Sequence, residues 1–317
     1  MPILREDPFL KRHYAPCFSP ATALAAILAV ASIGLPYVIL AFGSFWPAFG
    51  TFVEQPRVAY EGQMVLLLAG TTGAATTPLS IMWSTDANYN ANFALSSRVV
   101  TLETAEIDVD GDGKNDYLNF NITVPLTSSE QVAHVYAAFS FQYGLSSQLQ
   151  FQMQSLALLS TSTPSPSPTA LYIDGDLALT QRVLLSSSNK LAYDTPALDL
   201  TSTAASFTWE ALVASYADRD VRTVFNPSTP IWTSGAVSAA PFVFTGRIRY
   251  AQTTVTYSPS TAEVVKQVWV EYVVLFAGVA IVLRWVLGSL LRSGAVRTSL
   301  RIDRVPRVGA GAKEHVF

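Results

Sequence analysis

Two long apolar stretches constrain this chain more than any other feature of its sequence. No charged residue occurs from Tyr14 to Val53, and the centre of this stretch, Ala21–Trp46, exceeds the roughly 20 residues that an α-helix needs to cross a bilayer. A second apolar stretch, Val268–Leu291, has a similar length. The predicted organisation is a tail at 1–20, a transmembrane helix at 21–45, an outer domain at 46–267, a second transmembrane helix at 268–291 and a tail at 292–317.

The distribution of lysine and arginine predicts the orientation of the spans. Three basic residues lie in the N-terminal tail and six in the C-terminal tail, whereas the middle segment carries 10 basic and 18 acidic residues. Basic residues close to a span favour the cytoplasmic side. We therefore expect a multi-pass protein with both termini in the cytoplasm and the middle domain outside the cell or in a lumen. The basic C-terminal tail then meets anionic lipid headgroups or a cytoplasmic partner.

The first apolar stretch has one alternative reading, a cleaved signal peptide. Twenty residues precede it, Pro36 interrupts it, and it is longer than the apolar core of about 7–15 residues in such a peptide. These features favour a spanning helix that is kinked at Pro36, with the freed carbonyl satisfied by neighbouring groups.

The second span contains two charges, Glu271 and Arg284. Glu271 lies one turn inside the outer boundary, near the positive N-terminus of the expected helix. Arg284 lies close enough to the inner boundary for its guanidinium to reach the headgroups. The alternative is that both side chains contact a transmembrane helix of a partner protein.

Cysteine usage limits how the outer domain is held together. The only cysteine, Cys17, precedes the first span, so the outer domain forms no disulfide and must be stabilised by its own core. Cys17 is placed for palmitoylation at the membrane surface, and an unmodified thiol is the alternative.

The outer domain is predicted to be a large mainly-β domain, resembling a β-sandwich, that carries one helix. Short alternating or β-branched runs recur between glycine, proline and serine clusters. Helical spacing of apolar residues indicates one amphipathic helix within Phe207–Asp220, covering an edge or an end of the sandwich. The predicted strands are Met64–Leu68, Tyr117–Val124, His134–Tyr143, Leu149–Leu158, Leu171–Ile173, Phe242–Tyr250 and Thr253–Tyr257.

Turn residues mark the connections between these strands. The stretch Ser160–Ala170 is rich in proline and serine and is expected to be an exposed loop. Asp174-Gly175-Asp176 indicates a hairpin turn rather than a pair of catalytic carboxylates. We expect sheet edges that a neighbouring protein could bind at Val58–Leu68 and Ser155–Tyr172.

An aspartate-rich segment, Glu106–Phe120, is the strongest local motif. Carboxylates alternate through a glycine-containing turn, and hard cations such as Ca²⁺ are held by several carboxylate and carbonyl oxygens. The segment resembles the calcium loops of integrin-type repeats, and a solvated turn is the alternative reading. The predicted structural calcium site consists of the carboxylates of Asp108, Asp110, Asp112 and Asp116 with the carbonyl of Lys114.

Two further residues in the outer domain need interpretation. Asn121-Ile122-Thr123 is an N-glycosylation sequence, and modification requires that Asn121 face outwards from its strand. His134 stands in an apolar strand-like run, where a structural histidine is favoured over a catalytic base.

No arrangement typical of a catalytic site occurs along the chain. The motifs of serine hydrolases, zinc peptidases and phosphate-binding loops are absent. The pattern therefore indicates a protein that is not an enzyme and has no small-molecule substrate. The basic residues gather only in the short C-terminal tail, which argues against nucleic-acid binding.

The chain resembles the transmembrane protein 231 family of the ciliary transition zone, and the resemblance runs through nearly the whole sequence in the same order. It departs in both tails and in the loop Ser160–Ala170. The segments that carry it are VEQPRV, DGDGKNDYLNF, PLTSSEQV, LYIDGDLALTQ, VASYADRDVRTVFNPSTPIW, AAPFVFTGRIRY and VTYSPSTAEVVKQVWVEYV.

The resemblance implies a structural component of the Meckel-syndrome (MKS) module, a tectonic-like complex at the cilium base. Tectonic proteins and other membrane proteins of the transition zone are the implied partners, beside the membrane lipids. The implied role is in the diffusion barrier, in ciliogenesis and in the protein composition of the ciliary membrane. The alternatives are an accessory two-pass subunit of a channel or lipid transporter, and a membrane-bound hydrolase that uses the aspartates with a metal.

Overall fold

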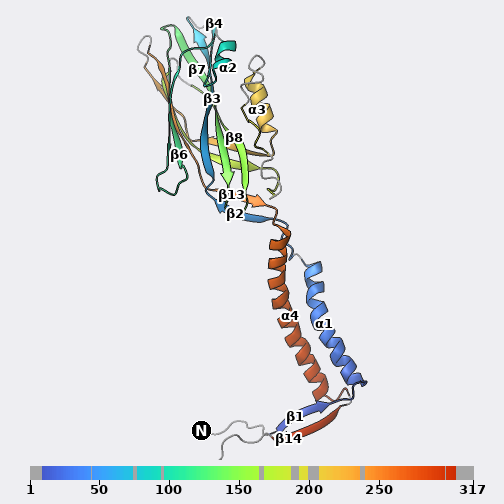
Figure 1. The fold of residues 1–317 in the computed structure, drawn as a ribbon. Coiled ribbons are helices and arrows are strands. Elements are labelled where there is room, and N and C mark those ends of the chain that lie inside the picture. Colours follow the sequence, from blue (N-terminus) through green and yellow to red (C-terminus); the bar gives the residue numbers. More distant parts are fainter. Residues whose placement is uncertain are drawn as a thin grey trace, which may run out of the picture. The chain divides into compact units, whose positions relative to one another are not determined.

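The computed structural model describes residues 9–43, 45–73, 77–93, 96–163, 168–186, 193–198, 207–235, 240–296 and 298–304, and the chain forms two compact units (Figure 1). One unit comprises Met1–Pro47 with Ser260–Phe317, and the other is the continuous segment Ala48–Pro259. The two transmembrane helices predicted from the sequence lie in the first unit, and the mainly-β domain is the second. The predicted fold class is thereby confirmed.

The β-domain consists of two packed sheets and a short two-stranded ribbon. In the larger sheet the order is β10-β9-β12-β6-β5 with β11 also beside β9, and only the pair β12–β9 is parallel. The smaller sheet has the antiparallel order β4-β3-β7-β8. The ribbon pairs β2 (Gly50–Glu54) with β13 (Thr253–Tyr257).

The strands of the larger sheet are β5 (Thr101–Ile107), β6 (Tyr117–Val124), β9 (Pro168–Gln181), β10 (Val221–Pro227), β11 (Ile231–Ser234) and β12 (Phe242–Arg249). The strands of the smaller sheet are β3 (Arg57–Thr72), β4 (Thr77–Ser84), β7 (Glu130–Leu145) and β8 (Phe151–Ser162).

The main core lies between the two sheets and follows from alternation along the strands. In β6, every second residue is buried, beginning with Leu118 and ending with Val124. Phe120 of β6 packs against Phe139 of β7 and Phe244 of β12, with ring centroids 4.8 and 5.0 Å apart. Because successive strand residues point to opposite faces, one apolar face of each sheet is buried in this core.

A smaller core covers the other face of the four-stranded sheet. Helix α3 (Trp209–Ala217) begins at Thr208, whose hydroxyl accepts a hydrogen bond from the Ala211 N–H. Its Leu212 and Tyr216 belong to one buried cluster with Val65 of β3 and Leu156 of β8. This covering helix explains why β7 is buried on both faces around Ala138. A second short helix that was not predicted, α2 (Ala87–Asn92), adds Tyr89 to the cluster.

The predicted turn at Asp174-Gly175-Asp176 is wrong, because all three residues lie inside strand β9. A side chain at Gly175 would collide with the backbone of Asn226 and Pro227 on the paired strand β10. This glycine therefore permits a close approach between strands, and Asp174 forms an ion pair with Arg249 of β12.

The predicted sheet edges are only partly correct. Val58–Leu68 lies in β3, between β4 and β7, and is therefore not at an edge. Strand β8 is the outer strand of its sheet, whereas β9 is interior. The predicted loop Ser160–Ala170 is also shorter than expected, since β8 continues to Ser162 and β9 begins at Pro168; residues 164–167 lie outside the described part of the chain.

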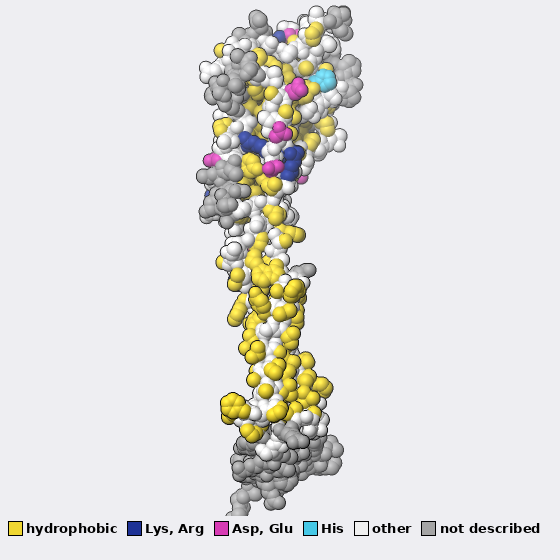
Figure 2. Space-filling view, turned by 90° about the vertical axis from the view of Figure 1, so that its right-hand side faces the viewer, with side chains coloured by type: hydrophobic (Ala, Val, Ile, Leu, Met, Phe, Trp, Pro, Cys, Tyr) yellow, Lys and Arg dark blue, Asp and Glu magenta, His cyan; other side chains and the backbone are white. Residues whose placement is uncertain are grey.

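The first unit consists of two long helices and a ribbon formed by the tails. Helices α1 (Pro20–Phe42) and α4 (Thr261–Arg292) lie side by side and have mean hydropathies of 2.3 and 2.2 (Figure 1). Ser19 and Ser260 cap their N-termini. Apolar side chains cover the outside of both helices, which is the surface expected in contact with lipid and not in the core of a soluble protein (Figure 2).

The tails pair with each other as strands, a feature that the sequence did not suggest. Strand β1 (Phe9–Tyr14) runs antiparallel to β14 (Ser299–Arg304), from Phe9 opposite Arg304 to Tyr14 opposite Ser299. Because β1 precedes α1 and β14 follows α4, this pairing joins segments from opposite ends of the chain.

Candidate functional site

Residues 108–116, the aspartate loop, join β5 to β6. The loop is held by hydrogen bonds between its own side chains and its own backbone. The Asp116 N–H donates to the Ile107 carbonyl at 2.8 Å and closes the hairpin. Gly111 and Gly113 have φ angles of 73° and 82°, a left-handed conformation that favours glycine. Both glycine N–H groups donate to the two carboxylate oxygens of Asp108, at 2.7 and 3.0 Å. The turn therefore points backbone donors at a central carboxylate.

Three of the predicted ligands lie together. Carboxylate oxygens of Asp108, Asp110 and Asp116 all lie within 4.8 Å of one another, whereas Asp112 is not part of this group. The Asp112 carboxylate instead accepts the Lys114 N–H at 2.8 Å. The Lys114 ammonium donates to the Gln55 carbonyl at 3.2 Å. The geometry is suited to a hard divalent cation held by three carboxylates.

Hydrogen bonds favour the ionised form of Asp108 and hold the Asp116 side chain in place. The Gly113 N–H, followed by other donors, lowers the pKa of the Asp108 carboxyl below its usual range. Asp116 accepts hydrogen bonds from the Gln55 side-chain amide at 2.8 Å and from the Val109 N–H at 2.7 Å. Gln55 follows β2, far away in sequence, and sequence reasoning did not find it. An ionised carboxylate has about four acceptor positions, so these bonds leave room for a cation.

Asn121 lies on the outward face of β6, because its neighbours Phe120 and Ile122 point into the core. Its side chain is half-buried, and the amide nitrogen donates to the Glu103 carboxylate at 3.1 Å. Asn121 therefore faces outwards from its strand, as glycosylation requires. The modification itself stays a prediction. His134 is exposed on β7, with its ring stacked beside that of Tyr136 at 6.3 Å.

The charged residues of the second helix have different surroundings. One carboxylate oxygen of Glu271 is buried and has no hydrogen-bond partner among the described residues. Arg284 is exposed and, with Ala25 and Ser32 of α1, lines a shallow hollow between the helices. Cys17 is exposed just before α1, as the palmitoylation prediction requires.

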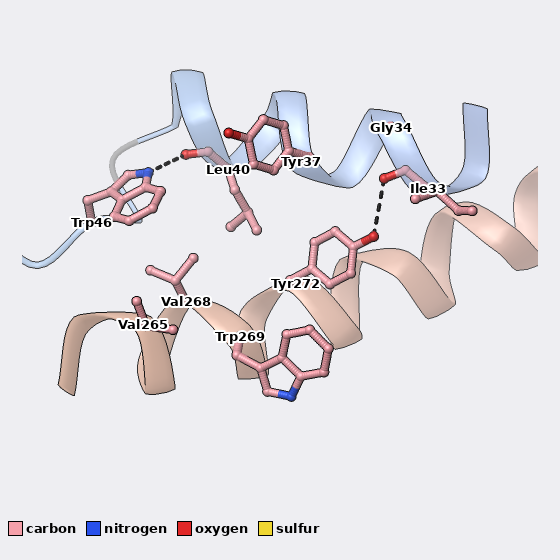
Figure 3. A pocket seen from close by; sticks show the side chains of 9 residues that line it. All are labelled: Ile33, Gly34, Tyr37, Leu40, Trp46, Val265, Val268, Trp269 and Tyr272. Atoms are coloured by element: carbon pink, nitrogen blue, oxygen red, sulfur yellow. Dashed lines mark hydrogen bonds between the residues drawn. The ribbon is translucent and has the colours of Figure 1, made fainter. Parts of the chain in front are cut away.

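An apolar groove of about 530 Å³ runs between the ends of α1 and α4 that are joined to the β-domain (Figure 3). Trp46 lies at one end of the groove, where its indole N–H donates to the Leu40 carbonyl at 2.9 Å. The Tyr272 hydroxyl crosses from α4 and donates to the Ile33 carbonyl at 3.2 Å. Pro36 lies inside α1 in this region and has no N–H, so the Ser32 carbonyl four residues earlier lacks its usual donor within the helix.

Comparison with known proteins places the chain in a family. The profile described as "Transmembrane protein 231" matches residues 4–299. The human protein of that name is 33% identical over 317 residues, covering 97% of this chain and 96% of the relative. The chicken protein is 34% identical over 294 residues (90% and 88%), and that of Xenopus tropicalis is 32% identical over 271 residues (84% and 85%). A cryo-EM structure of a proton-activated chloride channel has a TM-score of only 0.20 at 9% identity, and nothing is concluded from it.

The matches run almost from end to end and include both spans, the aspartate loop and the strands of both sheets. The chain belongs to the transmembrane protein 231 family.

Proposed function

We propose that this protein is a structural, non-enzymatic component of the ciliary transition zone, within an MKS or tectonic-like complex. Its role is to contribute to the membrane diffusion barrier at the cilium base, and through that barrier to cilium assembly and the protein composition of the ciliary membrane. The single observation that carries this proposal is the end-to-end match to the transmembrane protein 231 family.

The architecture supports the proposal in two ways. Both helices are covered with apolar side chains and can pack laterally against lipids and other membrane proteins. The β-domain is held by its own core and can present binding surfaces to neighbouring proteins.

The proposed partners are tectonic proteins and other membrane proteins of the same module, together with membrane lipids; neither nucleic acid nor a small-molecule substrate is included. The proposed orientation places both termini in the cytoplasm and the β-domain outside or in a lumen. The basic tails support this orientation through their charge.

Localisation and partner capture test the proposal together. A tagged full-length chain is expressed in ciliated cells, with a matched variant in which α4 is replaced by an unrelated transmembrane helix of equal length. The proposal predicts a ring at the ciliary base and enrichment of tectonic proteins with the natural chain. Uniform signal over the plasma membrane or endoplasmic reticulum, without tectonic enrichment, would count against it. Loss of enrichment in the helix-replacement variant alone would assign assembly to the membrane segment.

A further inference from the structure

The groove between α1 and α4 has the properties of a ligand site. Its volume of about 530 Å³ falls in the range of roughly 300–1,000 Å³ that is usual for small-molecule sites. None of its lining residues is charged. The polar atoms of two of its aromatic residues are already used within the helix pair, since Trp46 donates to Leu40 and Tyr272 to Ile33. The walls therefore offer an occupant mostly apolar contact.

The aromatic lining of the groove favours a flat occupant. Trp46, Trp269 and Tyr272 contribute aromatic rings, whereas Gly34 contributes no side chain and has open space where a Cβ would stand (Figure 3). A rigid ring system can lie against such rings and approach the α1 backbone at Gly34. A flexible acyl chain would lose more conformational entropy in the same space.

Two polar groups that line the groove, the Tyr37 hydroxyl and the Trp269 indole N–H, have no hydrogen-bond partner among the described residues. The Tyr37 side chain is 66% exposed. Tyr37 lies near the end of α1 that leads to the β-domain, where tyrosine and tryptophan commonly mark the membrane interface. A ligand with a single hydroxyl on an apolar body matches this arrangement, whereas a phosphate headgroup finds no cation among the lining residues.

We propose that this groove binds a sterol from the leaflet nearest the β-domain. The ring system lies between the two helices beside Gly34, and the sterol hydroxyl bonds to Tyr37. Lipid hydrocarbon is the solvent of these exposed faces, so the sterol reaches the groove by lateral diffusion in the bilayer.

The test uses the full chain in lipid nanodiscs and two photoactivatable probes, a diazirine cholesterol and a phosphatidylcholine with a diazirine in one acyl chain. Peptide mass spectrometry locates the crosslinks after illumination. The cholesterol probe is expected to label residues 33–40 and 265–272, and excess unlabelled cholesterol is expected to compete. Equal labelling of these residues by the phosphatidylcholine probe, without competition by cholesterol, would overturn the proposal.

Variants separate binding in the groove from general lipid contact. Gly34→Leu fills the groove, and labelling is expected to fall by about tenfold or more. Ala26→Leu, an increase in size that is smaller by one carbon and stands at an exposed position of α1 outside the groove, is expected to leave labelling unchanged. Tyr37→Phe keeps the ring and removes the hydroxyl, and labelling is expected to fall about threefold. Unchanged labelling in Gly34→Leu, or in Tyr37→Phe should Gly34→Leu fail to fold, contradicts sterol binding at this site.

Discussion

At the scale of single residues, a few buried polar groups determine how loops attach to the β-domain. Glu54 at the end of β2 is only 7% exposed, yet its carboxylate accepts hydrogen bonds from both the Ser146 and Ser147 N–H groups at 3.0 Å. The Ser147 hydroxyl donates to the same carboxylate at 2.8 Å. A buried charge is tolerated only with such partners, so one glutamate anchors the loop between β7 and β8.

Replacing Glu54 with glutamine should destabilise the β-domain by about 1 kcal/mol, because the hydrogen bonds from the Ser146 and Ser147 N–H groups lose the charge of their acceptor. Thermal or denaturant unfolding of the full chain in detergent, followed by tryptophan fluorescence, measures the change. Glu210→Gln removes the same charge at an exposed position and is the control. Equal stability of the two variants would mean that Glu54 does not anchor the loop.

The lowered pKa of Asp108 predicts a pH dependence. Because the folded pKa lies below the unfolded value, the carboxylate contributes stability that is present above the unfolded pKa and is lost as pH falls through the folded pKa. Asp108→Asn should therefore lower Tm at neutral pH, and its difference from the natural chain should shrink below about pH 4. A difference in Tm that is the same at pH 7 and pH 3 would contradict this account.

Calcium binding to the aspartate loop can be tested with a control that the structure itself supplies. Asp110→Asn should abolish calcium binding, whereas Asp112→Asn should retain most of it, since Asp112 lies outside the carboxylate group. At a calcium concentration 100 times Kd, binding should raise the free energy of unfolding by about 2.7 kcal/mol. Isothermal titration of the full chain measures the affinity. No heat of binding at millimolar calcium would leave the loop as a plain turn.

At the scale of elements, helix α3 connects the two sheets through the hydrogen bonds of one side chain, Tyr216. The Tyr216 hydroxyl accepts hydrogen bonds from the Leu156 N–H of β8 and the Thr223 N–H of β10, both at 2.9 Å. These strands are the outer strands of their respective sheets. One side chain of the helix thus satisfies backbone groups on both edges, which would otherwise be open to pairing with another strand.

Tyr216→Phe should cost about 2–3 kcal/mol or more, because two buried N–H groups lose their acceptor. Burial raises the pKa of the Tyr216 hydroxyl, so it is neutral near pH 7 and can both donate and accept. Tyr136→Phe is the matched change at a tyrosine whose hydroxyl has no hydrogen-bond partner among the described residues. Denaturant unfolding compares the two variants, and similar losses in both would refute the bridging role.

The elements that could be predicted from the sequence are those with long or regular apolar patterns. The spans and β6 follow directly from apolar length and strict alternation. Strand β10 could not be predicted with the same ease, because it follows α3 directly and only Val221, Thr223 and Phe225 mark its buried face. Strand β5 was missed because its polar, largely exposed residues lack an apolar face.

The details of the candidate site depend on tertiary contacts that a sequence does not contain. The alternating aspartates indicated a cluster, but they could not show that Asp112 turns to the backbone while Gln55 from another segment bonds to Asp116. The groove was missed for the same reason, because it forms only when two helices far apart in sequence pack together. The pairing of the tails brings together segments from opposite ends of the chain.

At the scale of the whole molecule, two spans require that both tails share one side of the membrane, and the antiparallel pairing of β1 with β14 agrees with this requirement. Epitope tags at each terminus and within residues 164–167 can report the sides. With the plasma membrane intact, only the internal tag should be accessible to antibody; after permeabilisation, all three should be. Access to one terminal tag but not the other would contradict the two-pass topology.

Diffusion of membrane proteins across the cilium base measures the proposed barrier function most directly. In ciliated cells that lack their own transmembrane protein 231, a fluorescent membrane protein normally kept out of the cilium is followed by photobleaching. Expression of this chain should restore a ring at the ciliary base and slow exchange between the plasma and ciliary membranes. A correctly placed ring with unrestricted exchange would contradict the proposed barrier function.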